Sequence, residues 1–169
     1  MNLHTNLQGR LRNTRLPKSH GLWPVFETVV NSIHSLEERG NIKTEGKITL
    51  RISRAFQASL ELDGESRVND IEGFVVEDNG IGFNDTNMKS FETLDSDHKI
   101  EKGGRGVGRL LWLKAFDRVE INSDFKDSQG KPMHRVISFD AKSGVELVEE
   151  KESILFSYDS FVEESRVVR

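Results

Sequence analysis

The most informative stretch of this sequence is Lys102-Gly103-Gly104-Arg105-Gly106-Val107-Gly108-Arg109, which runs directly into Leu110-Leu111-Trp112-Leu113. The apolar run predicts a buried helix, and the glycines lie where that helix begins. Backbone N–H groups at a helix N-terminus form a site for anions, and Lys102, Arg105 and Arg109 add positive charge. The stretch therefore predicts a phosphate-binding loop. A glycine-rich turn that binds nothing has the same composition, so the loop alone leaves both interpretations open.

Length and composition point to one globular domain. The chain has 169 residues, of which 35% are hydrophobic and 31% are charged, and this suits a soluble protein with a core of its own. No run approaches the roughly 18 apolar residues of a membrane span, so no membrane partner is expected. The absence of cysteine excludes disulfides and thiolate metal sites and fits a cytoplasmic location.

The positive charge at the start of the chain has no acidic counterpart. Residues 1–18 contain no Asp or Glu, although the net charge of the whole chain is −4. We interpret this segment as a basic N-terminal arm that precedes a domain at 19–169. The arm could bind nucleic acid, or it could lie on the acidic surface of its own domain. Its basic residues are Arg10, Arg12, Arg15 and Lys18.

A strong helix is predicted for 19–39. Its apolar residues recur at spacings of three and four, which predicts one buried face, made of Leu22, Val25, Phe26, Val29, Val30, Ile33 and Leu36. Ser19 is a plausible N-cap, and Gly40 closes the helix. Glu27 and Asn31 lie four residues apart and therefore point the same way, with His34 one turn further on. A functional pair and a solvated polar edge both fit this pattern.

A second motif follows a predicted strand at 71–76. The strand runs into Glu77-Asp78-Asn79-Gly80-Ile81-Gly82. Two glycines separated by one residue predict a tight turn that lets a flat ligand approach the backbone. Asp78 could accept a hydrogen bond from an exocyclic amine, which would select adenine over guanine. An ordinary Asp-Asn-Gly turn has the same signature.

The rest of the chain alternates helical and strand patterns. Residues 84–102 are expected to form a short helix and then a loop, and 107–116 a helix. The predicted fold class is α+β, a two-layer sandwich with helices on one face of a mixed, mostly antiparallel sheet. The remaining strands are predicted as a hairpin of 48–52 with Leu60 and Leu62, followed by 118–123, 135–139, 145–148 and 154–158.

Taken in order, these motifs resemble those of the GHKL ATPases, the superfamily of gyrase B, the large heat-shock chaperones, histidine kinases and MutL. The motifs are Glu27-x-x-x-Asn31, Asp78-x-Gly80-x-Gly82 and Gly104-x-Gly106-x-Gly108. The resemblance runs from about Pro24 to Phe139. It implies a Bergerat-type ATP-binding fold.

The resemblance also implies a role for each motif. Asn31 would coordinate Mg²⁺, Asp78 would receive the adenine amino group, and Glu27 would be the general base that deprotonates the attacking water. Residues 84–102 would form the lid over ATP. The phosphates would be bound by the loop Lys102, Gly103, Gly104, Arg105, Gly106, Val107 and Gly108, with Gly80 and Gly82 beside the base.

The chain departs from the family in three places. His34 stands where many relatives carry Asp, no Gly-Thr pair follows Gly108, and no lysine for the γ-phosphate is evident. Glu27 favours hydrolysis over phosphoryl transfer to a protein, because the family members that hydrolyse ATP have a similar Glu-x-x-x-Asn arrangement. Three alternatives stay open: a module that senses ATP without hydrolysing it, a phosphotransferase of the histidine-kinase kind, and an α+β domain with no nucleotide site.

For the whole protein, the resemblance implies an ATP-driven switch. Lid closure and dimerisation of two copies would accompany ATP binding, and the output would belong to downstream domains or a client protein. That output could be DNA handling. The loop looks closest to stand-alone bacterial GHKL ATPases of large multidomain proteins, some of which act in defence against phage. The chain is expected to be the N-terminal fragment of such a protein, with slow hydrolysis on its own.

Overall fold

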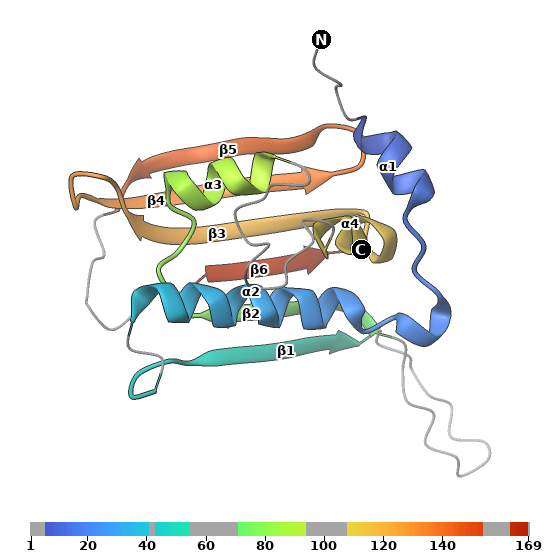
Figure 1. Ribbon diagram of the computed structural model, residues 1–169, viewed down its shortest axis with the longest axis horizontal. Coiled ribbons are helices and arrows are strands. Elements are labelled where there is room, and N and C mark those ends of the chain that lie inside the picture. Colours follow the sequence, from blue (N-terminus) through green and yellow to red (C-terminus); the bar gives the residue numbers. More distant parts are fainter. Residues whose placement is uncertain (1–5, 41–42, 55–70, 94–107, 154–162, 169) are drawn as a thin grey trace.

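The computed structural model describes residues 6–40, 43–54, 71–93, 108–153 and, for the backbone alone, 163–168. Its helices lie over one face of a six-stranded sheet (Figure 1), and the predicted α+β class is confirmed. Every strand pairing is antiparallel. The elements are α1 Leu7–Asn13, η1 Lys18–His20, α2 Trp23–Arg39, β1 Ile48–Arg54, β2 Ile71–Asp78, α3 Asp85–Glu92, α4 Gly108–Ala115, β3 Arg118–Lys126, β4 Pro132–Asp140, β5 Gly144–Glu152 and β6 Glu163–Val168.

The strand order is β1-β2-β6-β3-β4-β5. The predicted strands near 48–52, 71–76, 118–123, 135–139 and 145–148 are all present, as β1 to β5. The sequence did not predict β6, which joins the two halves of the sheet by pairing with both β2 and β3. The expected strands at Leu60–Leu62 and 154–158 lie outside the described residues, and β1 pairs with β2.

The core lies between the sheet and the helices. Side chains alternate along β2, β3 and β4, so that one face of each strand is buried under the helices. Aromatic rings from three elements meet there: the ring of Phe91 on α3 lies 5.4 Å from that of Phe139 on β4 and 6.1 Å from that of Trp112 on α4. None of the helices that the structure describes is long and apolar enough to cross a membrane.

Helix α2 is rotated relative to the predicted orientation. Its buried side chains are mostly small or polar (Pro24, Thr28, Ser32, Ser35 and Leu36). The apolar residues expected in the core divide: Val25 and Val29 are half-buried, but Leu22, Phe26, Val30 and Ile33 are exposed. The predicted buried face was therefore wrong for these four residues. Small side chains let the helix approach the sheet and its loops closely, and large ones would hold it away.

The ends of α2 were partly predicted. Gly40 ends the helix with a φ of 90° and donates its N–H to the carbonyls of Leu36 and Glu37, as expected for a C-terminal glycine. The N-terminus was placed too early, because Ser19 lies in η1 and the helix is preceded by Leu22, which provides no side-chain cap.

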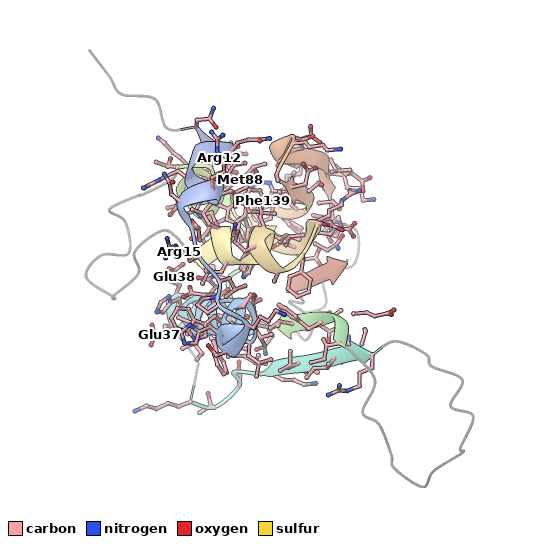
Figure 2. All side chains as sticks on the ribbon, turned by 90° about the vertical axis from the view of Figure 1, so that its right-hand side faces the viewer. Arg12, Arg15, Glu37, Glu38, Met88 and Phe139 are labelled. Carbon is pink, nitrogen blue, oxygen red and sulfur yellow. The ribbon has the colours of Figure 1, made fainter. Side chains whose placement is uncertain are left out.

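The basic segment is not a free arm over its whole length. Residues 7–13 form α1, in which Leu11 is buried and Leu7 packs against the core. Gln8 donates its side-chain N–H to the carbonyl of Ala141, 3.1 Å away in the turn between β4 and β5. Arg12 and Arg15 remain exposed and are labelled in Figure 2.

Arg135 connects β4 to the start of α3. Its side chain is only 6% exposed, and its guanidinium contacts Glu150 on β5 at 2.5 Å and Asp85 on α3 at 2.7 Å. It also donates to the carbonyl of Phe83 at 2.8 Å and lies 4.4 Å from the ring centre of Phe125. The buried cation therefore fixes the segment that leaves β2 and enters α3.

Replacing Arg135 tests this connection. Arg135→Met leaves Glu150 without its cation and the Phe83 carbonyl without its donor. We expect the free energy of unfolding to fall by roughly 2–4 kcal/mol, somewhat less than for a fully buried pair because Glu150 keeps partial access to water. Lys131→Met removes the exposed pair with Glu152 and should cost less than about 1 kcal/mol. Urea denaturation measures both, and equal losses would contradict the proposed connection.

Candidate nucleotide site

Glu27 and Asn31 lie along one edge of α2, with His34 beside them. The four-residue spacing places Glu27 and Asn31 on the same side of the helix, and the exposure of the three differs: Glu27 and His34 are half-buried, whereas the Asn31 side chain is exposed. The carboxylate of Glu27 lies against Gly108, the first residue of α4. A Cβ added to Gly108 would overlap the Glu27 carboxylate, so this pairing requires glycine.

Burial raises the pKa of the Glu27 carboxyl. The charged form loses water on entering this half-buried position, and this favours the protonated form. A carboxylate with a raised pKa binds a proton more readily than one in water. Glu27 therefore has the property that a general base needs.

Asp78 is buried at the end of β2, on the face of the sheet that the helices cover. It is 4% exposed, and its Oδ1 accepts a hydrogen bond of 2.8 Å from the N–H of Gly80. Gly80 packs directly on Ser35 of α2, where a Cβ would overlap the serine. The N–H of Ile81 completes the contact by donating to the Ser35 hydroxyl at 3.1 Å and to the Ser35 carbonyl at 3.2 Å.

Gly82 lies in the segment between β2 and α3 and packs against β3. Its φ of 76° is rarely adopted by other residues, and a Cβ there would overlap the Asp124 carbonyl. The next residue, Phe83, donates its N–H to the Ser123 hydroxyl at 2.7 Å. The predicted tight turn is present, and contacts within the chain explain glycine at both positions. A ligand close to Gly80 or Gly82 remains a prediction.

The first half of the predicted lid forms α3. Asn84 caps the helix by accepting from the N–H of Asn87 at 2.9 Å. The Asn87 side chain donates to the Gly82 carbonyl at 3.0 Å and reaches Glu38 on α2 at 3.5 Å. Phe91 is buried in the core. The start of α3 is therefore held by the turn after β2, and the rest of the expected lid, 94–102, lies outside the described residues.

Arg109 is bound to α3 rather than directed at the glycine loop. Its guanidinium donates to the carbonyls of Ser90 and Phe91 and lies 5.0 Å from the Phe91 ring centre. Burial lowers its pKa to about 10. The charge that the sequence placed beside the phosphates therefore neutralises carbonyls at the C-terminus of α3.

The structure brings together Glu27, Gly108 and the Asp78–Gly82 turn around α2. Among the residues that it describes, no three His, Asp or Glu side chains form a metal-binding group. The exposed Asn31 amide nevertheless fits Mg²⁺, which takes one or two protein oxygens and fills its other positions with phosphate and water. The other predicted loop residues lie outside the described residues: Lys102, Gly103, Gly104, Arg105, Gly106 and Val107.

Three residues that hold the site were missed in the sequence. Ser35 binds the turn at Ile81, and Ser123 binds Phe83. Asn79 accepts from the N–H of Lys47 at 2.7 Å and donates to the carbonyl of Glu45 at 2.8 Å. For Ser35 the sequence did contain a signal. Thr28, Ser32 and Ser35 are small polar residues at spacings of four and three, and this pattern indicates one helix face that can pack closely. No signal pointed to Ser123.

The contact between Glu27 and Gly108 can be tested by substitution. Gly108→Ala places a methyl group against the carboxylate, which can shift because it ends a flexible side chain, so we expect the free energy of unfolding to fall by only about 1 kcal/mol. In a Glu27→Ala background the same change should be neutral or stabilising, because alanine favours helices. Gly9→Ala is the matched control, since a Cβ there meets nothing closer than 3.9 Å. Urea titration gives the free energy of unfolding of the four Glu27/Gly108 combinations. Additive effects of the two substitutions would contradict the contact.

The buried carboxylate also predicts a dependence on pH. Because the pKa of Glu27 is raised in the folded state, its charge costs stability above that pKa, and the cost disappears below the usual value of 4.5. Glu27→Gln should therefore be more stable than wild type at pH 7 and equal to it at pH 4. Thermal melts of both proteins across this range measure the difference. A gain that persisted unchanged at pH 4 would show that deprotonation is not its source.

Comparison with known proteins does not assign the chain to a family. No protein-family model matches the chain. No curated protein matches it either. The resemblance to the GHKL ATPases therefore rests on the three sequence motifs.

Proposed function

We propose that this domain binds ATP with Mg²⁺ and hydrolyses it, in the manner of the GHKL ATPases. One observation carries the proposal: the Glu27 carboxylate lies against Gly108, where the glycine-rich loop becomes α4. Two residues 81 positions apart in the sequence thus meet at the point where the motif predicts phosphates. The Asp78 turn is attached to the same helix through Ser35.

Asp78 supports the choice of adenine. Its carboxylate is buried and held by the Gly80 N–H, so its orientation is fixed before a ligand arrives. An ionised carboxylate only accepts hydrogen bonds. It would pair with the exocyclic amine of adenine and would reject the carbonyl that guanine has at that position.

The start of α4 supports binding of the phosphates. The helix begins at Gly108 with no acidic residue in its first turn, and its free N–H groups attract anions. Lys102, Arg105 and the glycines before Gly108 would complete the loop. Asn31 would hold Mg²⁺, which supplies positive charge to the triphosphate when it is bound.

Glu27 would act on the water that attacks the γ-phosphorus. Its carboxylate would accept the proton as the oxygen of water bonds to phosphorus and the bond to the β-phosphate oxygen breaks, giving ADP and phosphate. The raised pKa of Glu27 favours this proton transfer. A non-hydrolysing ATP sensor is the second candidate, favoured by His34 standing where many GHKL relatives carry Asp.

The wider role follows the GHKL resemblance. ATP would close the lid and bring two copies together in the cytoplasm, and downstream domains or a client protein would use the motion, in DNA handling or defence against phage. Arg12 and Arg15, which are exposed, would with Lys18 and Arg10 be the residues through which nucleic acid is contacted.

Ligand-dependent stability tests binding and hydrolysis separately. ATP with Mg²⁺ at 100 times its dissociation constant should stabilise wild type by about 2.7 kcal/mol. Asp78→Asn keeps an acceptor for the Gly80 N–H but presents an amide, so it should remain folded and lose the stabilisation by ATP. Glu27→Gln should keep the stabilisation and lose phosphate release. Thermal shift and a phosphate assay measure the two effects.

The control and the contradicting results are distinct. Glu146→Gln removes a carboxylate from the exposed strand β5 and should behave as wild type in both assays. Stabilisation without phosphate release from wild type would favour the ATP sensor. No stabilisation of wild type by ATP would contradict the whole proposal.

A further inference from the structure

The outer face of α2 is apolar and exposed. Five large side chains form this surface, which we call the α2 stripe, with exposed fractions between 37% and 58%: Leu22, Trp23, Phe26, Val30 and Ile33. Strand β1 continues it, because Leu50 and Ile52 pair with Val76 and Phe74 and so face the side of the sheet on which α2 lies. Both are more than 40% exposed.

A single exposed apolar side chain needs no explanation, but a continuous row on one helix does. Contiguous apolar patches of this kind mark surfaces that bind another protein. Packing against the sheet does not use the stripe, because α2 turns its small residues Thr28, Ser32 and Ser35 inward. Helix α2 therefore has two contact faces, of which the sheet occupies one.

The two ends of the stripe carry opposite charges. Exposed Arg15 and Lys18 precede its start, and exposed Glu37 and Glu38 follow its end. Figure 2 shows Arg15, Glu37 and Glu38 on the side of the molecule where the helices lie. A surface that is basic at one end, apolar in the middle and acidic at the other end is complementary to itself when turned by 180°.

We propose that the α2 stripe binds a second copy of this chain, with the two α2 helices antiparallel across a two-fold axis. An isologous interface requires one patch that complements itself. In the antiparallel arrangement the basic end of each stripe faces the acidic end of the other, so this patch meets the requirement. An axis near Thr28 would place Phe26 opposite Val30 of the second copy and Trp23 opposite its Ile33. The same axis brings the segment with Lys18, which precedes the helix, towards the acidic end of the second copy, where Glu37 and Glu38 lie.

The length of α2 suits such an interface. Its 17 residues span about 25 Å at 1.5 Å per residue, and the exposed side chains of β1 widen the contact. The Glu27 carboxylate lies against Gly108 of α4 and is not part of the stripe. The stripe is exposed without a ligand, so this pairing requires no ATP and is separate from the ATP-dependent approach of two copies proposed above.

Sedimentation equilibrium without nucleotide tests the proposal. Wild type should dimerise in the micromolar range, and Phe26→Asp should weaken the dimer on the order of thirtyfold or more, since a central aromatic residue contributes strongly to an interface. Leu147→Asp is the matched control. Leu147 is 52% exposed, on the edge strand β5, and its replacement should leave the dimer unchanged.

Reversal of charge tests the antiparallel arrangement. Lys18→Glu and Glu38→Lys should each weaken the dimer roughly two- to tenfold, because the pair occurs twice, and the double variant should recover wild-type affinity. Circular dichroism melts confirm that each variant folds. A wild type that stays monomeric, a Phe26→Asp variant with unchanged affinity, or a double variant without recovery would overturn the proposal. Because no ATP is present, failure here is independent of the nucleotide site.

Discussion

The close approach of α2 to the turn after β2 is the constraint on which the site depends. Ser35 and Gly80 touch without room for another atom, and the N–H of Ile81 bonds to both oxygens of Ser35. This contact sets the distance of α2 from the sheet. It also fixes the rotation of the helix, because only its small side chains fit there. Glu27, two turns earlier on α2, is thereby brought to Gly108.

The same constraint explains why the large apolar side chains of α2 are outside. Had Phe26 or Val30 faced the sheet, the helix could not approach Gly80, and Glu27 would move away from α4. The packing of the small α2 side chains against the sheet therefore accounts both for the position of the candidate site and for the exposure of the α2 stripe. One helix supplies a polar flank to the candidate site and an apolar face to its surroundings.

Helix α3 is connected to this arrangement at both ends. Asn87 holds its start to Gly82, and Arg109 holds its end to α4. Arg109 directly follows Gly108, so the first turn of α4 is attached to the end of α3. Arg135 braces the segment between β2 and α3 from the opposite side. Three polar side chains thus link α3 to the turn after β2, to the start of α4 and to β4.

Much of this could be predicted from local pattern. Alternation and turn residues located β1 to β5, and the apolar run after Gly108 located α4, because these signals are contained within a few residues. The rotation of α2 could not be read from its hydrophobic period. That period shows where the apolar residues recur, but the small residues between them are the ones that pack against the sheet.

Contacts between residues far apart in the chain could not be predicted from the sequence either. Glu163–Val168 carries too many charged residues to indicate a strand that joins β2 to β3. For Arg109, sequence proximity to the glycines suggested phosphate, whereas its partners are carbonyls at the end of α3. The contact of Glu27 with Gly108 was not predicted, since nothing in the spacing of the two residues brings them together.

Hydrogen exchange with and without an ATP analogue and Mg²⁺ tests the central claim most directly, which is that three separate segments form one nucleotide site. The account predicts slower exchange of backbone N–H groups at 78–83 and 108–113, and also along α2 near Glu27 and Asn31, with strand β5 unchanged. Protection confined to one of these segments, or spread equally to β5, would contradict a shared site.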